Sequence, residues 1–149
     1  MNRYLQLFSR RVLPLLIVLG LFAAQYFDPG TNVDTGSNRS GSGEVEAAFT
    51  AQHSGQWVAA SGRVVRLLAD DNEGSRHQRF ILELDSGHTL LVAHNIDLAR
   101  RLPLARNDRV ELRGRYEWNE RGGVVHWTHH DPDGRLQGGW VLHEGTRFR

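Results

Sequence analysis

Histidine is the residue type in this sequence with the clearest capacity for chemistry. The chain has eight histidines and no cysteine. Imidazole is the commonest metal ligand and titrates close to neutral pH, so histidines gathered in one place indicate a metal site or a pH-responsive surface. Six of them fall at or near predicted strand ends or in the C-terminal third of the chain: His77, His94, His126, His129, His130 and His143.

The segment HWTHHD, from His126 to Asp131, carries the densest group. In an extended strand His126 and His130 would lie about 13 Å apart, too far to share one metal ion. A turn at His129 would instead bring a histidine and a carboxylate together, and neighbouring strands would complete the site. We therefore predict these metal ligands: His94, His126, His129, His130, Asp131 and His143. Ligands of these types suit one divalent transition metal, Zn or Mn above all, and an open coordination position would activate water.

A structural explanation stays open for each single histidine, because imidazoles can hydrogen-bond or pack against the four tryptophans. Other chemistries have less support. The lack of cysteine excludes disulfides, thiolate metal sites and a cysteine nucleophile. No serine stands in a nucleophile-elbow sequence and no glycine-rich phosphate loop precedes a helix, so we expect neither acyl transfer nor a nucleotide cofactor. No catalytic residue can be assigned.

Residues 1–27 predict a membrane segment. They hold three arginines and no acidic residue, and the arginines precede an apolar run from Val12 to Ala24. This is the pattern of an export signal or a signal anchor. The run is short for a membrane span, which favours cleavage, but a cut at its end would put a large residue at the −3 position, which favours retention. A retained anchor would be a single-pass helix in the inner membrane, with the rest of the chain in the periplasm or another extracytoplasmic space.

The remaining chain divides into a linker and one domain. Residues 28–43 consist of turn formers and small polar residues, which predict a flexible linker. Residues 44–149 are enough for one domain with a single core. Residues 28–149 hold 15 arginines against 17 acidic residues, and this balance argues against a protein that binds nucleic acid non-specifically through its net charge.

The periodicity of residues 44–149 predicts a mainly β domain. Its expected elements are a short amphipathic helix (44–52), a long strand bent at Gly62 (56–68), two strands joined by a hairpin turn (79–84 and 88–93), a helical turn capped by Asn95 (95–101), two further strands (109–118 and 124–129) and a last short strand (140–143). This order predicts a small five-stranded OB-like barrel with one short helix between strands 3 and 4. A six-stranded barrel or a small sandwich is the alternative.

The barrel prediction carries a second set of candidate residues. OB-type barrels bind ligands on their second and third strands and on the adjoining loops, which are residues 69–76 and 119–123 here. Aromatic stacking and contacts from arginine or histidine would hold the ligand. The predicted ligand-binding residues are Arg79, Asn95, Trp118, Asn119 and Trp127.

Two stretches of sequence resemble a known family. They are residues 94–97 (HNID) and the segment from Tyr116 to Pro132, which ends in HWTHHDP. Over about residues 45–149 the chain resembles an uncharacterised bacterial family, a domain of unknown function. The resemblance implies an exported protein of small size and brings no activity with it.

Three classes of function fit the sequence. The first is a membrane-tethered extracytoplasmic binding module whose ligand would be a nucleic acid strand, an envelope glycan or another envelope protein. The second is a metal-dependent hydrolase of the phosphodiesterase or nuclease type that uses the predicted metal ligands. The third is a structural envelope protein in which the histidines only pack. We favour the first, because the pattern predicts a fold more strongly than it predicts a reaction.

Overall fold

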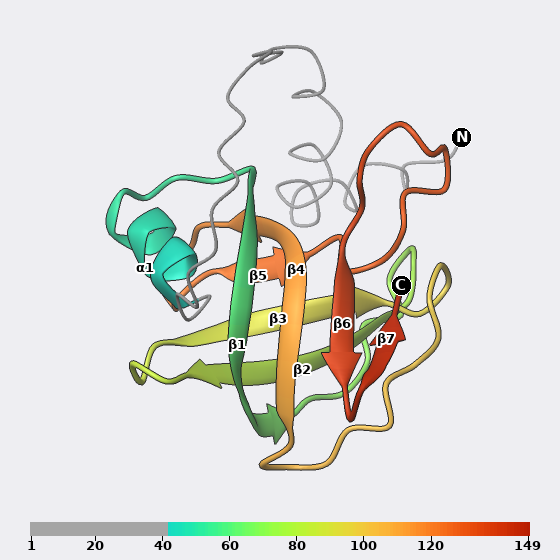
Figure 1. The fold of residues 1–149 in the computed structure, drawn as a ribbon, viewed down its shortest axis with the longest axis horizontal. Helices are drawn as coiled ribbons and strands as arrows, with labels where there is room; N and C mark the ends of the chain where they lie inside the picture. Colours follow the sequence, from blue (N-terminus) through green and yellow to red (C-terminus); the bar gives the residue numbers. More distant parts are fainter. Residues whose placement is uncertain (1–41) are drawn as a thin grey trace, which may run out of the picture. The chain divides into compact units, whose positions relative to one another are not determined.

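The computed structural model describes residues 42–149, which form one helix followed by a seven-stranded sheet (Figure 1). The elements are α1 (Ser42–Thr50), β1 (Gln56–Leu67), β2 (His77–Leu84), β3 (Thr89–Asn95), β4 (Arg109–Glu117), β5 (Val124–His126), β6 (Trp140–His143) and β7 (Thr146–Phe148). The predicted membrane segment and nearly all of the predicted linker lie outside the described residues. Within residues 42–149, no helix has the length and apolar character needed to cross a membrane.

Five of the strands close into a barrel. The strands follow the order β1-β2-β3-β5-β4, and β4 pairs again with β1. Every pairing in this ring is antiparallel except that of β3 with β5, which is parallel. Strands β6 and β7 add to the sheet beyond β4. The expected mainly β domain with a closed five-stranded barrel is therefore confirmed.

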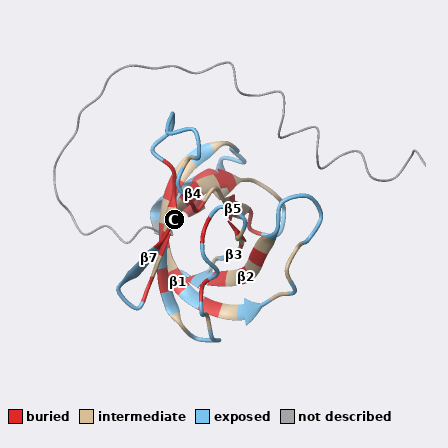
Figure 2. Cartoon of the chain, turned by 90° about the vertical axis from the view of Figure 1, so that its right-hand side faces the viewer, coloured by how far each residue is buried: buried red, intermediate tan, exposed pale blue. Residues whose placement is uncertain are grey.

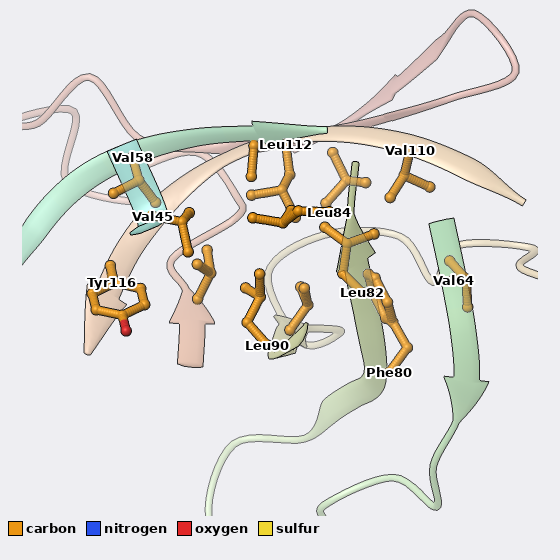
Figure 3. Packing of buried hydrophobic residues seen from close by; sticks show 14 of the residues in the cluster. Val45, Val58, Val64, Phe80, Leu82, Leu84, Leu90, Val110, Leu112 and Tyr116 are labelled. Atoms are coloured by element: carbon orange, nitrogen blue, oxygen red, sulfur yellow. The ribbon is translucent and has the colours of Figure 1, made fainter. Parts of the chain in front are cut away.

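The barrel core follows from the alternation of side chains along each strand. In β2, Phe80 and Leu82 are fully buried, whereas Glu83 is exposed. Figure 2 shows the same alternation of buried and exposed positions around the barrel. The buried side chains of β1 to β4 meet inside the barrel together with Val45 from α1 (Figure 3).

Strand β1 is long and serves two neighbours. Its residues 56–63 pair with β4, and its residues 62–67 pair with β2. Gly62 lies where the two pairings overlap, and a Cβ atom there would collide with the carbonyl oxygen of Glu83. The register with β2 then shifts between Val64 and Arg66. The sequence placed the bend of this strand correctly, since only glycine allows this close approach of backbones.

The helix expected between strands 3 and 4 is absent from the structure. Residues 96–98 form only a turn, in which Asn95 Oδ1 accepts hydrogen bonds from the backbone N–H groups of Asp97 and Leu98. The chain then runs to Leu102, whose N–H and C=O both bond to the side chain of Gln78 in β2. Because Leu102 is bonded to β2 and Pro103 follows it, the chain cannot continue into a second helical turn.

The helix of the described residues instead precedes the barrel, where residues 44–52 were expected to be helical. Val45 and Ala48 of α1 are buried in the core. Glu44 Oε2 accepts a hydrogen bond of 2.7 Å from the backbone N–H of Ala59. This N–H lies in the part of β1 that β2 does not reach, so α1 covers an edge of β1 that would otherwise be unpaired.

Strands β5 and β6 occupy the same edge of β4. β1 lines one edge of β4, and on the other edge residues 115–117 pair with β5 while residues 110–113 pair with β6. Both short strands run antiparallel to β4, so they form one interrupted strand from which residues 127–139 loop out. The strand expected at 124–129 therefore ends at His126, because Trp127 has a positive φ of 54°. The sequence did not predict β7.

Gly114 lies where the pairing of β4 changes from β5 to β6, and replacing it with alanine should destabilise the barrel. A Cβ atom at Gly114 would lie 2.5 Å from the carbonyl oxygen of His126 and 2.5 Å from Val125 Cγ1. We expect Gly114→Ala to lower the free energy of unfolding by about 1–3 kcal/mol, measured by urea denaturation. Gly43→Ala is the matched control, because nothing lies within 4 Å of its added Cβ. Equal stability of the two variants would contradict the prediction.

Candidate functional site

Five histidines gather near the ends of β2, β3 and β5. His77 begins β2, and its strand pairs with β3 so that His94 lies opposite Gln78. His126 ends β5, and His129 and His130 follow in the loop of residues 127–139. These imidazoles are close enough for their charges to interact, because His77 and His129 contribute to the lowered pKa of His94. His77, His126 and His130 contribute in the same way to the lowered pKa of His129. Four of the predicted metal ligands belong to this group: His94, His126, His129 and His130.

His94 is a buried link between β3 and the loop of residues 127–139. Its side chain is 0% exposed. Its Nε2 lies 3.1 Å from the carbonyl oxygen of Arg100, which can only accept, so Nε2 carries the proton. Its Nδ1 then accepts a hydrogen bond of 2.8 Å from the hydroxyl of Thr128. Both ring nitrogens have partners, which leaves neither free for a metal ion.

His129 and His126 each have one ring nitrogen held by a neighbour. His129 is 5% exposed, its Nδ1 donates to the carbonyl oxygen of His130 at 2.6 Å, and its ring stacks on Trp127. Burial lowers the pKa of the His129 imidazole. His126 Nε2 lies 3.4 Å from Glu117 Oε1, and this hydrogen bond is the main cause that lowers the pKa of Glu117. His130 is exposed.

The other two predicted metal ligands do not join this group. His143 lies at the far end of β6 from the loop, where its Nε2 donates to Asp108 Oδ2 at 2.9 Å. Asp131 turns back into its own loop, and its Oδ2 accepts from the backbone N–H groups of Arg135 and Leu136. Within residues 42–149, no group of three or more histidine, aspartate or glutamate side chains is arranged to hold a metal ion.

The five predicted ligand-binding residues have different surroundings in the structure. Asn95 and Asn119 use their side-chain oxygens to hold turns, since Asn119 Oδ1 accepts from the N–H groups of residues 121 and 123. Trp118 packs against the hydrophobic core. Trp127 and Arg79 are half-buried, and Arg79 Nε donates to the carbonyl oxygen of Ala69.

A row of aliphatic side chains crosses the outer side of β2, β3 and β5. Ile81 lies opposite Leu91, and Leu91 lies opposite Val124. All three are half-buried on the side of the barrel that faces away from the core. Arg79 lies opposite Ala93 next to this row, and His126 is two residues after Val124. The sequence carries a signal for this row, because consecutive aliphatic residues in β2 and β3 indicate strands that are apolar on both faces.

The two loops beside this row are held in place by side chains. In residues 68–76, Arg76 pairs with Asp97 at 2.7 Å, and Asp70 pairs with Arg101. In residues 118–123, the carbonyl oxygen of Gly122 accepts from the hydroxyl of Tyr116 at 3.2 Å and from Nε2 of His88 at 2.9 Å. A surface bordered by held loops loses little conformational entropy when a ligand binds.

The burial of His94 should make the stability of the domain depend on pH. Burial lowers the pKa of His94 from 6.5 to about 4. Between these values the unfolded chain takes up a proton that the folded chain excludes, so the free energy of unfolding falls as the pH falls from 6.5 towards 4. This one group contributes about 3 kcal/mol to that fall.

Urea denaturation across this pH range measures the effect. Gln in place of His94 keeps a donor and an acceptor but does not titrate, so His94→Gln should flatten the dependence. His53→Gln, at an exposed position after α1, is the control and should leave it unchanged. A dependence as steep in His94→Gln as in the unchanged chain would contradict the role of His94. Burial lowers the pKa of His129 as well, so the free energy of unfolding of His94→Gln should still fall with falling pH, but less steeply.

Comparison with known proteins gives a family without an activity. No curated protein matches the chain significantly. Residues 35–149 match the model of a family described as "Protein of unknown function (DUF3465)". This match covers all the helices and strands that the structure describes. The chain therefore belongs to the DUF3465 family of proteins of unknown function.

Proposed function

We propose that this protein is a membrane-tethered, extracytoplasmic binding module built on an OB-type barrel. The observation that carries the binding role is the row of Ile81, Leu91 and Val124, aligned by strand register on the outer side of β2, β3 and β5. The partly exposed atoms of these side chains would give a ligand an apolar surface to contact, and contiguous apolar patches on a protein surface often mark interaction sites. The arginine-flanked apolar run of residues 1–27 supports the tether and the export of the domain.

The strand arrangement supports the OB-type assignment. A five-stranded Greek-key barrel of this type binds its ligands on the outer surface of strands 2 and 3, between two loops. The aliphatic row lies on those strands, and residues 68–76 and 118–123 are the corresponding loops. A helix before β1, in place of one between β3 and β4, leaves this surface unchanged.

Among the ligand classes that the sequence left open, we propose an envelope glycan. Sugar rings present apolar C–H faces, which suit the aliphatic row, and hydroxyl groups, which suit hydrogen-bonding side chains at its border. Arg79 and His126 stand at that border, and both are half-buried. The metal-dependent hydrolase has less support, because the described residues offer no converging set of three ligands.

Substitution within the aliphatic row should weaken glycan binding. Leu91→Asn puts a polar amide in the middle of the row, and we expect the affinity for a soluble cell-wall glycan fragment to fall about tenfold or more. Thr89→Asn is the matched control, because Thr89 lies on the same strand and the same side but is exposed at its end. Amide chemical shifts of the full chain in detergent micelles, titrated with the fragment, measure binding and locate it. Shifts elsewhere than β2, β3 and β5, or equal losses in both variants, would refute the proposed surface.

The tether is tested in cells with the full chain carrying a C-terminal reporter. We expect the protein to stay with the membrane fraction after an alkaline wash and its reporter to be cleaved by protease added outside the inner membrane. Replacing Arg3, Arg10 and Arg11 with glutamate should reduce the exported fraction, because the positive charges orient the segment. Recovery of the unaltered chain in the cytosol, or as a soluble periplasmic product, would contradict the proposal.

A further inference from the structure

Two tryptophans and two arginines alternate across the outer side of β1, β4, β6 and β7. The guanidinium carbon of Arg113 lies 4.9 Å from the ring centre of Trp57, and that of Arg147 lies 4.6 Å from the ring centre of Trp140. Arg113 is also the direct cross-strand partner of Trp140. These four residues, here called the Trp–Arg row, therefore form a continuous strip over four strands.

Strand alternation directs the Trp–Arg row away from the core. The residues next to its members in sequence, such as Val58, Leu112, Val141 and Phe148, are buried. The members themselves are half-buried or, for Arg147, exposed. In Figure 1, β1, β4 and β6 run side by side, and β2 and β3 cross behind them. The Trp–Arg row thus lies on a different face of the barrel from the aliphatic row of β2, β3 and β5.

Arginines outnumber glutamates among the outward side chains of these four strands, although residues 28–149 hold more acidic residues than arginines. The side chains directed outward from β1, β4, β6 and β7 include five arginines and two glutamates: Arg63, Arg109, Arg113, Arg115, Arg147, Glu111 and Glu117. Arg109 pairs with Asp85, Arg115 pairs with Glu117, and Arg63 lies opposite Glu83 of β2. Within the described part of the chain, Arg113 and Arg147 form no ion pair. Arg113 Nη1 donates to the carbonyl oxygen of Gly138 at 3.0 Å, and this neutral partner leaves the charge of Arg113 uncompensated. The charges of Arg113 and Arg147 can therefore attract an anionic ligand.

From this placement we propose that the Trp–Arg row binds single-stranded nucleic acid. Proteins bind single strands by combining arginines that contact phosphates with aromatic rings on which bases stack, and guanidinium planes also stack on bases. The Trp–Arg row offers both groups in alternation on an open sheet face. An acidic polysaccharide would use the arginines but has no planar bases for the indole rings. The inference does not depend on the glycan-binding proposal, because it rests on a different face.

Binding is measured with the full chain in detergent micelles and a fluorescently labelled oligothymidylate, by anisotropy over a range of salt concentrations. Arg147→Ala should weaken binding about tenfold, because it removes one charged contact. It should also reduce the slope of log affinity against log salt concentration by about 0.7. Arg147 is exposed, so its loss should not affect folding. Trp140→Ala should weaken binding about tenfold through lost stacking, and Trp140→Phe should restore most of it.

Arg106→Ala is the matched control. Arg106 is exposed in the turn before β4, so its substitution removes the same charge outside the Trp–Arg row. The proposal expects Arg106→Ala to bind like the unchanged chain, and Leu91→Asn to do so as well. Equal losses in Arg106→Ala and Arg147→Ala would overturn it, since binding would then follow net charge alone. Binding of polygalacturonate as tight as that of oligothymidylate, or no binding of oligothymidylate, would also overturn it.

Discussion

Strand β4 is hydrogen-bonded along both of its edges, and the rest of the structure depends on this pairing. On one edge it closes the barrel against β1, and on the other it holds β5 and then β6. Gly114 lies at the change from one partner to the next, where any side chain would strike the backbone of His126. Because β5 and β6 share one edge, the intervening residues 127–139 must leave the sheet there. The loop with the densest histidines is therefore a consequence of how β4 is paired.

The loop is held to the barrel by a buried polar contact. His94 reaches Thr128 from inside the end of β3, and its second nitrogen bonds to the backbone of residue 100. A buried imidazole stays neutral when burial opposes its charge, and its two hydrogen bonds then fix both neighbours. His94 and His129 thus act as structural links, and His126 lies beside Glu117 at the surface. This arrangement explains why so many imidazoles gather without converging on one point.

The barrel leaves two outer faces of different chemistry, and they carry the two proposals. One face has an aliphatic row between loops braced by ion pairs and hydrogen bonds. The other has arginines stacked on tryptophans, with two guanidinium groups that form no ion pair within residues 42–149. The two proposed ligands would contact separate sets of residues, because the two rows share no residue. Binding on either face would be independent of a reaction, in keeping with a fold that does not by itself imply catalysis.

Most of the strands could be predicted from the sequence, because alternation and turn residues are local properties. Patterns only a few residues long predict helix α1, the bend at Gly62 and the hairpin at residues 85–87. The prediction of a helix after β3 was wrong because Leu102 bonds to Gln78, a residue 24 positions away that local pattern does not reveal. β7 was not predicted because its three residues are too few to show an alternation of polar and apolar side chains.

The candidate site, too, was predicted in part from the sequence and in part decided by the tertiary structure. The residue types that could bind or react, and the crowding of histidines near residues 126–130, are properties of the sequence alone. Which of them meet was decided by the folded chain. Asp131 accepts from N–H groups of its own loop, and the pairing of β4 with β6 brings His143 to Asp108. Register also assembled Ile81, Leu91 and Val124, and Arg113 and Trp140, from separate strands. Such neighbours are set by hydrogen bonds between distant segments, and no local pattern encodes them.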